Sequence, residues 1–288
     1  MTDAIPDNPE NVQTEDWAGD MGKKWLSNLS RFEGMIEPIG DALLALADYR
    51  AGERVLDIGF GGGATTIAIA EAVAPNGKVM GVDISPDLAD AASDRATKAG
   101  ITNAQFTCAD AAAVQLEDAP YDRLFSRFGS MFFDKPKAAF SNLHGLLLSG
   151  GRIDLAVWGP PRDNLWMMEM MSVVKSHVEV PPAIPRAPGP FAFEDLEYLN
   201  EILASAGFSD VDIDTYEGLQ PIGGPGAKPQ EAVDFALASM AAGRLLKEKG
   251  DDVLHKASDE LVSLFKEHQV PGKGVMMKAK AWLVSATA

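Results

Sequence analysis

Short apolar segments alternate with amphipathic ones through the first half of the chain. Five apolar segments have the length and composition of buried strands: Arg54–Asp57, Lys78–Asp83, Ala104–Cys108, Asp122–Ser126 and Gly151–Trp158. Helical patterns lie between most of them, over Gly62–Val73, Pro86–Ala99 and Lys135–Leu148. Short buried strands that alternate with helices are typical of a parallel sheet covered on both faces. We therefore expect an α/β core.

The segments that flank this core have a different pattern. Residues 1–16 are polar and are expected to fray, whereas Trp17 to Leu46 has helical periodicity that Pro38 and Gly40 are expected to divide into two helices. The later segments are expected to be a helix at Asn164–Glu179, an extended connector at Val180–Pro190, a helix at Glu194–Ala206, a strand at Val211–Tyr216, a loop at Gly218–Pro229, helices within Gln230–His268 and a strand at Gly274–Ala286. The sheet should thus have seven strands.

Composition narrows the class of protein. The 288 residues are 46% hydrophobic and 23% charged, as in ordinary globular proteins, and no apolar run has the length of a membrane helix. A net charge of −17 counts against a nucleic-acid substrate, because such binding depends on basic side chains. The N-terminus lacks the pattern of a secretory signal, and the single cysteine, Cys108, is expected to be a buried strand residue. We expect a cytoplasmic protein without a membrane or nucleic-acid partner.

A glycine-rich turn between the first strand and the helix after it carries the main chemical signal. Glycine lets a ligand approach the exposed amides at such a junction closely. The spacing Gly59-x-Gly61-x-x-Ala64, with Asp83 about 20 residues further on, also satisfies the dinucleotide-binding fingerprint. The glycines alone therefore leave the nucleotide open.

Three further features of the sequence indicate which nucleotide cofactor the loop binds. Asp57 precedes the first glycine by two residues, where a carboxylate is unfavourable beside a pyrophosphate but favourable near a sulfonium and an ammonium group. Asp110 follows the third strand, where it can accept a hydrogen bond from an adenine amino group. No tyrosine has a lysine four residues later, as short-chain dehydrogenases require.

At these positions the chain resembles the class I S-adenosylmethionine-dependent methyltransferases. Val55–Gly63 contains their Asp-x-Gly-x-Gly-x-Gly motif, and the resemblance continues to Trp158 through Gly81–Ser85, Cys108–Ala111, Tyr121-Asp122 and Leu148–Arg152. Within the class, the chain looks most similar to the ubiquinone/menaquinone C-methyltransferase-like group. The resemblance implies a Rossmann-like, seven-stranded, mostly parallel sheet and S-adenosylmethionine as cofactor.

The resemblance also implies roles for individual residues. Asp57 would contact the ammonium end of the methionine moiety, Asp83 the ribose diol and Asp110 the adenine edge; the less favoured alternative is that Asp110 is only a strand-end turn residue. The implied cofactor-binding set is Trp25, Asp57, Gly59, Gly61, Gly63, Asp83, Ile84, Asp110, Ala111 and Ser126.

The methyl acceptor should bind under a helical cap at the carboxyl ends of the strands. We expect residues 1–50 to form a tail and cap helices, 51–158 the cofactor-binding core, 159–193 an inserted cap segment, and 194–288 the rest of the sheet with a helical insertion at about 230–268. Aromatic residues and methionine suit an apolar pocket, although core packing is the commoner role for any single one of them. The pocket candidates are Trp17, Phe128, Met131, Trp158 and Trp166.

A catalytic base is not evident from the sequence. His177 is the candidate, because it lies on the expected insertion helix, whereas His144, His255 and His268 are expected at the surface. We expect no metal. The predicted activity is methyl transfer to a small, partly apolar molecule, with O-methylation favoured and C-, N- and S-methylation open. The alternatives are an NAD(P)-dependent Rossmann oxidoreductase and a non-catalytic S-adenosylmethionine-binding protein; the oligomeric state stays open.

Overall fold

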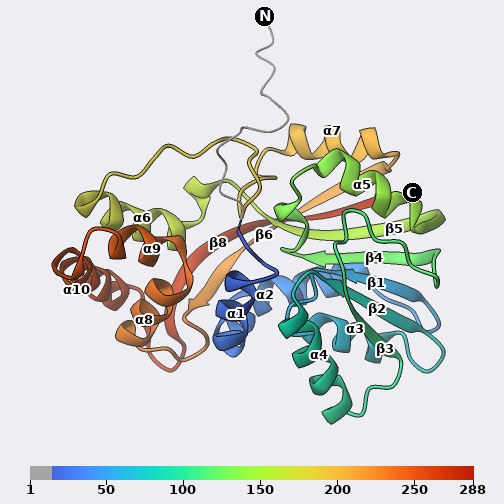
Figure 1. Ribbon diagram of the computed structural model, residues 1–288, viewed down its shortest axis with the longest axis horizontal. Helices are drawn as coiled ribbons and strands as arrows, with labels where there is room; N and C mark the ends of the chain where they lie inside the picture. The colour runs from blue at the N-terminus through green and yellow to red at the C-terminus, as the bar shows by residue number, and fades with distance from the viewer. Residues whose placement is uncertain (1–14) are drawn as a thin grey trace, which may run out of the picture.

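The computed structural model describes residues 15–288, and a single twisted sheet runs through it (Figure 1). The strand order is β3-β2-β1-β4-β5-β8-β6, with a short β7 paired to β8. The strands are β1 (Arg54–Ile58), β2 (Lys78–Asp83), β3 (Ala104–Cys108), β4 (Tyr121–Arg127), β5 (Leu147–Trp158), β6 (Ser209–Ile222), β7 (Gln269–Val270) and β8 (Gly274–Thr287). The pairs among β1 to β5 are parallel, and β8 is antiparallel to β5 and β6. The predicted mostly parallel α/β fold is confirmed, and the two-residue β7 makes the sheet eight-stranded instead of the expected seven.

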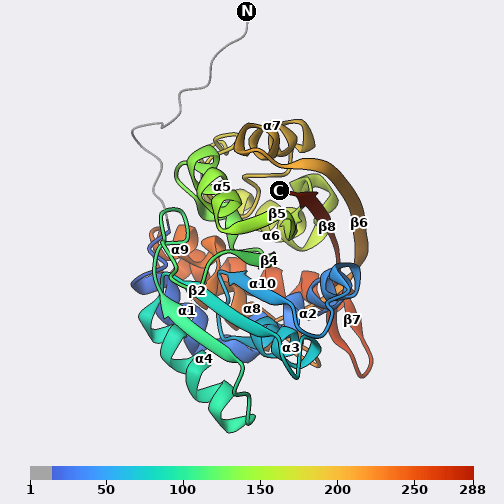
Figure 2. The same ribbon diagram turned by 90° about the vertical axis from the view of Figure 1, so that its right-hand side faces the viewer.

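Helices cover both faces of this sheet (Figures 1 and 2). One face carries α2 (Leu29–Ala47), α3 (Ala64–Ala72) and α4 (Pro86–Lys98), and the other carries α5 (Pro136–Gly145) and α7 (Leu196–Ala206). The helix α4 begins where expected, because the Ser85 hydroxyl accepts a hydrogen bond from the Leu88 amide. The helix α7 ends at Gly207, whose φ of 103° is readily adopted by glycine.

The strands β6 and β8 extend past the other strands. The pairing of β5 with β8 ends at Trp158 and Ala281, and Ala281 also pairs with Tyr216 of β6. From there six more residues of β6, up to Ile222, pair only with β8. At 3.3 Å a residue, this two-stranded ribbon projects about 20 Å beyond the end of β5.

The projecting ribbon carries the helices at the left of Figure 1. Between β6 and β8 the chain forms α8 (Pro229–Ser239), α9 (Ala241–Lys247) and α10 (Asp251–Glu267), and α6 (Leu165–His177) packs on α9 and α10. We call α6 and α8 to α10 the cap helices. The first helix, α1 (Asp20–Ser27), packs between α4 and α8.

The expected break at Pro38 and Gly40 is wrong. The helix α2 continues through Pro38, and the division falls at Asn28, between α1 and α2. Proline removes only one helical hydrogen bond, and the buried Ile36 and Ile39 hold the helix on the sheet on both sides of it. Packing therefore outweighs the local preference.

Two other expected boundaries are also wrong. The segment after Gly218 was expected to be a loop, but β6 runs to Ile222 with Pro221 paired to Met276. Because β6 is at the edge of the sheet, the missing N–H of Pro221 breaks no ladder. The helix expected over Lys135–Leu148 ends at Gly145, since Leu147 already pairs with Tyr121 in the sheet.

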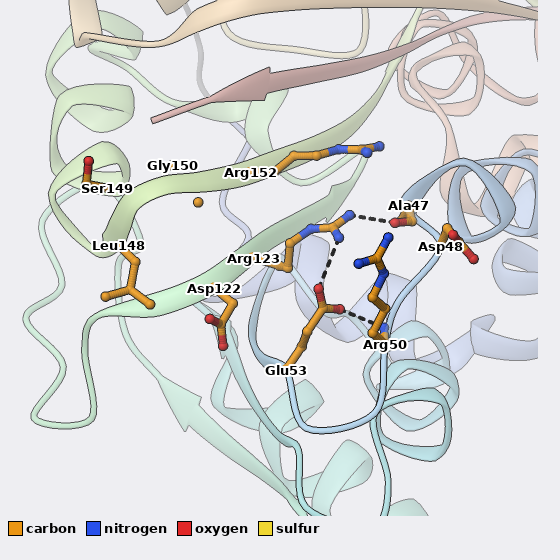
Figure 3. A pocket seen from close by; sticks show the side chains of 11 residues that line it. Ala47, Asp48, Arg50, Glu53, Asp122, Arg123, Leu148, Ser149, Gly150 and Arg152 are labelled. Carbon is orange, nitrogen blue, oxygen red and sulfur yellow. Dashed lines mark hydrogen bonds and ion pairs between the residues drawn. The ribbon is translucent and has the colours of Figure 1, made fainter.

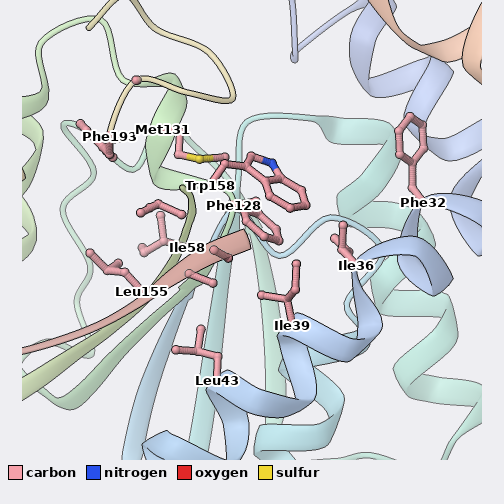
Figure 4. Packing of buried hydrophobic residues seen from close by; sticks show 14 of the residues in the cluster. Phe32, Ile36, Ile39, Leu43, Ile58, Phe128, Met131, Leu155, Trp158 and Phe193 are labelled. Atoms are coloured by element: carbon pink, nitrogen blue, oxygen red, sulfur yellow. The ribbon is translucent and has the colours of Figure 1, made fainter. Parts of the chain in front are cut away.

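One large apolar core joins the sheet to the helices. Figure 4 shows Ile36, Ile39 and Leu43 of α2 directed toward the sheet and toward Phe128. Cys108 is exposed at the end of the edge strand β3, which corrects the expectation that it is buried. No helix among residues 15–288 has the length and apolar character needed to cross a membrane.

Candidate functional site

The glycine loop between β1 and α3 has the backbone that the sequence requires. Gly59, Gly61 and Gly63 have φ values of 69°, 57° and 77°, a region that other residues rarely adopt. A Cβ at Gly59 would lie 2.7 Å from the Cα of Gly129, and a Cβ at Gly63 would lie 2.8 Å from the Cβ of Ala92. Glycine is therefore the only residue that fits these positions without backbone strain or a steric clash.

Asp57 lies below this loop, and only one of its two carboxylate oxygens is hydrogen-bonded among the described residues. Its Oδ2 accepts hydrogen bonds from the hydroxyls of Thr65 (3.0 Å) and Thr66 (2.7 Å) in the first turn of α3. Its Oδ1 is buried without a partner among the described residues. Burial raises the pKa of Asp57 to about 6, and the two hydroxyls and the nearby Arg127 oppose this rise. The free oxygen can accept a hydrogen bond from a cationic ligand, which would favour ionised Asp57.

Asp83 connects the end of β2 to the same loop. Its Oδ2 accepts a hydrogen bond from the Gly61 amide (2.9 Å), and its Oδ1 accepts one from the Ser85 amide (3.0 Å). Each carboxylate oxygen can accept a second hydrogen bond, so a ligand diol can still bind there. Burial raises the pKa of Asp83, and the backbone amides lower it.

Aromatic side chains from the N-terminal segment cover the glycine loop. The Trp25 indole Nε1 would lie 3.3 Å from a Cβ on Gly61, and it is buried without a partner among the described residues. The Trp25 ring stacks on Phe32 at 4.1 Å and meets Trp17 edge-on at 5.7 Å. Two of the predicted residues, Trp17 and Trp25, are thus brought together over the loop.

An ion pair and a hydrogen bond also connect α2, which covers the glycine loop, to the loop itself. Glu33 of α2 pairs with Arg95 of α4 at 2.8 Å, and Arg95 donates a hydrogen bond to the Gly62 carbonyl at 3.2 Å. On α1, Gly22 packs against the hydroxyl of Ser85, with 2.5 Å between that oxygen and the position of a Cβ. The roof formed by α1 and α2 therefore contacts both the loop and the start of α4.

The remaining predicted cofactor residues lie at the ends of neighbouring strands. Ile84 is 43% exposed after β2, which is unusual for a large apolar side chain and leaves it free to pack on a ligand ring. Asp110 is exposed and accepts a hydrogen bond from the Ala112 amide, so it does form a turn, while Ala111 is buried. Ser126 donates a hydrogen bond to the Ile58 carbonyl at 2.9 Å and thereby ties β4 to β1.

The predicted acceptor-pocket residues form a second aromatic group. Phe128 stacks on Trp158 at 4.2 Å, and Trp158 lies 5.3 Å from Trp166 of α6. Met131 is buried in the 3₁₀-helix η1 (Ser130–Phe132), and its carbonyl accepts a hydrogen bond from the Gly189 amide. All four side chains are buried, so they pack in the core cluster whatever else they contact.

His177 is not brought to the glycine loop. It lies at the end of α6, where its Nε2 is 3.2 Å from Glu260 of α10. His268 and His144, which were expected at the surface, are half-buried, with His268 2.5 Å from Glu169 and His144 edge-on to Phe208. Among residues 15–288, no cluster of three potential metal ligands occurs.

Arg127 is a charged residue at this edge that the motif did not assign to the cofactor. Its guanidinium packs on α2, where a Cβ at Gly40 would lie 2.6 Å from it, and its Nε is buried without a partner among the described residues. Burial lowers the pKa of Arg127, while Asp57 and three acids of α2 raise it.

A cavity of about 370 Å³ lies at the opposite edge of the sheet (Figure 3). It is lined by residues at the amino ends of β1, β4 and β5, where Arg123 pairs with the fully buried Asp154 at 2.7 Å and with Glu53 at 3.3 Å. Arg123 and Arg152 both pair with Asp154, and ligands of open α/β sheets bind at the carboxyl ends. We therefore place the functional site at the glycine loop.

Part of the chain is similar to known methyltransferases. Residues 55–151 match the family model described as a methyltransferase domain. The aklanonic acid methyltransferase DauC of Streptomyces sp. (strain C5) is 33% identical over 116 residues, or 40% of this chain and 53% of that protein. The protein-L-isoaspartate O-methyltransferase of Methanococcus aeolicus is 36% identical over 91 residues, or 32% of this chain and 40% of that protein. The chain thus spans about half or less of these relatives' length.

The fold is also found in solved structures. The YcgJ protein of Bacillus subtilis has a TM-score of 0.58 at 20% identity, over 87% of this chain and 98% of that one. The comparisons confirm the predicted Rossmann-like fold and a methyltransferase domain. The finer resemblance to ubiquinone/menaquinone C-methyltransferases stays a prediction.

Proposed function

We propose that this protein transfers a methyl group from S-adenosylmethionine to an oxygen of a small, partly apolar molecule. The observation that carries the proposal is the free, buried Oδ1 of Asp57 beneath the glycine loop and the aromatic roof. Arg127 lies near Asp57 but no ion pair joins them among residues 15–288, and a buried carboxylate oxygen without a direct partner is costly, a cost that a cationic ligand offsets. The ammonium group of the cofactor's methionine end supplies that charge.

The other residues at the loop suit the rest of the cofactor. The glycine loop would lie beside the methionine moiety, and Asp83 would accept hydrogen bonds from the ribose diol. The exposed Ile84 would pack on the adenine, with Asp110 and Ala111 at its edge. Trp25 would close over the loop from above.

Among residues 15–288 no histidine is recorded in contact with the glycine-loop residues, and this favours an acceptor that needs no base. The cofactor supplies an activated methyl carbon, whose bond to sulfur breaks as the bond to the acceptor oxygen forms. A carboxylate is already ionised at neutral pH, so proximity and alignment are sufficient for its methylation. The protein's task would then be to exclude water and to align the acceptor oxygen with the methyl carbon.

The relatives support an oxygen acceptor. DauC is named for aklanonic acid, and the archaeal relative is an O-methyltransferase of protein isoaspartate, so both printed names point to acidic compounds. The aromatic residues Phe128, Trp158 and Trp166 favour a small apolar molecule over a protein chain. The net charge of −17 disfavours nucleic acid.

Titration calorimetry and a methyl-transfer assay test the proposal. We expect S-adenosylhomocysteine to bind with micromolar affinity and NADH not to bind. Labelled S-adenosylmethionine should methylate aklanonic acid, or members of a panel of aromatic carboxylic acids, but not their methyl esters. Binding of NADH alone would show an oxidoreductase, and cofactor binding without methylation of any acceptor would show a non-catalytic binding protein.

A further inference from the structure

Gln220 of β6 is a fully buried amide that has no hydrogen-bond partner in the described part of the chain. Its side chain is 0% exposed, and neither its Oε1 nor its Nε2 has a partner among residues 15–288. Buried amides in folded proteins almost always have partners, because an unpaired one lowers stability. The native fold therefore keeps a group that destabilises it.

Packing does not explain this glutamine. Its cross-strand neighbour is Met277, which is also 0% exposed, and Ile222 and Val275 are buried next to this pair. A methionine has nearly the same length and shape as glutamine and would fill the same space without an unpaired amide. The amide must serve something other than the core.

The position of Gln220 indicates what the amide serves. Alternation along β6 and the register with β8 put Gln220 on the sheet face of Tyr216 and Trp158. It lies four residues past Tyr216, or about 13 Å beyond the end of β5 along the projecting ribbon. This ribbon leads away from the carboxyl edge, where the glycine loop lies, and into the cap helices.

A second unpaired group lies in the same part of the molecule. The hydroxyl of Ser239, at the end of α8, is buried and has no partner among the described residues. Phe235 of the same helix contacts Phe32, which stacks on Trp25 above the glycine loop. The cap and the cofactor roof are thus continuous through aromatic contacts.

We propose that Gln220 determines acceptor specificity by hydrogen bonding an oxygen group at the end of the acceptor remote from the methylated atom. This inference rests on the proposed function. A side-chain amide donates and accepts, so it fits a carbonyl or hydroxyl group. The acceptor class is accordingly an elongated, largely apolar carboxylic acid with a second oxygen function at its far end.

The test compares Gln220→Met with Gln105→Met, a change at an exposed glutamine of β3. We expect Gln220→Met to raise the Tm by about 2–4 °C, because the unpaired amide is removed, and Gln105→Met to leave it unchanged. Affinity for S-adenosylhomocysteine should stay the same in both. A fall in Tm, or failure of Gln220→Met to fold, would show that the amide is structural and overturn the proposal.

The acceptor arm uses pairs of aromatic carboxylic acids that differ only in a distal hydroxyl or carbonyl group. The wild type should prefer the oxygenated member by at least about tenfold in kcat/KM, and Gln220→Met should lose this preference. Gln220→Asn, which withdraws the amide by one methylene, should weaken the preference without raising the Tm. A preference that persists in Gln220→Met overturns the proposal. If no acid is methylated although S-adenosylhomocysteine binds, the proposed function fails and the Tm shift alone decides the role of Gln220.

Discussion

The hydroxyl of Thr66 donates a 2.7 Å hydrogen bond to Oδ2 of Asp57, and this contact joins the end of β1 to the first turn of α3 across the glycine loop. It also fixes which carboxylate oxygen is left for a ligand. Oδ1 is buried and free, so the carboxylate is both positioned by the fold and incompletely satisfied by it. The first two predictions follow from this arrangement.

We expect Asp57→Asn to stabilise the protein at neutral pH in the absence of ligand. Asp57 has a folded-state pKa of about 6 against an ordinary value of 3.8, so the folded state holds the proton more tightly. Stability should therefore fall as the pH rises from about 4 to 6, by up to about 3 kcal/mol. Urea unfolding at pH 4 to 8 should show this fall in the wild type and a smaller one in Asp57→Asn, because Asp83 also has a raised pKa. Asp110→Asn, at an exposed carboxylate, is the control, and a variant less stable than the wild type at pH 7.5 would contradict the prediction.

We expect the affinity for S-adenosylmethionine to rise with pH through the same range. Ionised Asp57 attracts the ammonium group, so binding should strengthen by up to about tenfold per pH unit below pH 6 and level off above it. Calorimetry at pH 5 to 8 measures this directly. In Asp57→Asn the affinity should be weaker and nearly independent of pH; an unchanged pH profile would remove Asp57 from the cofactor site.

We expect Gly59→Ala to destabilise the fold more than Gly100→Ala. Both glycines have positive φ values, 69° and 72°, but a Cβ at Gly59 would meet the Gly129 backbone at 2.7 Å, whereas nothing lies within 4 Å at Gly100. Backbone strain alone should cost Gly100→Ala about 1 kcal/mol, and the clash should add at least about 1–2 kcal/mol at Gly59. Urea unfolding measures the difference, and equal losses would show that the loop relaxes around the extra methyl group.

We expect Asp83→Ala to weaken S-adenosylhomocysteine binding by about 2–4 kcal/mol. The substitution removes the acceptor proposed for the ribose hydroxyls and also leaves the amides of Gly61 and Ser85 unpaired. Adenosine distinguishes the lost ribose contact from a disturbed glycine loop, because it carries the ribose and adenine without the methionine moiety that would lie beside the loop. If Asp83 binds the ribose, the affinity for adenosine should fall as well. Asp90→Ala, at an exposed position of α4, is the control. Unchanged affinity in Asp83→Ala would overturn the ribose assignment.

Local motifs were predictable from the sequence, and long-range contacts were not. Asp57, the three glycines and the Ser85 cap lie in short segments whose backbone geometry depends on their own residue types. The unpaired amide of Gln220 has no local signal, because a polar residue in an alternating strand is normally exposed. The extent of β6 was also hidden, since Gly218 and Pro221 usually mark a loop and the edge position that tolerates Pro221 is set by the order of the whole sheet.

The ends of the helical insertion between β6 and β8 lie side by side, because Ile222 and Val275 are paired in the same ribbon. Everything between them, including α8, α9 and α10, leaves and re-enters the sheet at one place, about 5 Å apart. Such a segment can be lengthened, shortened or exchanged without moving the strands that hold the cofactor loop. The fold thus separates two parts that can change independently, the strands that hold the glycine loop and a helical insertion that covers their carboxyl ends.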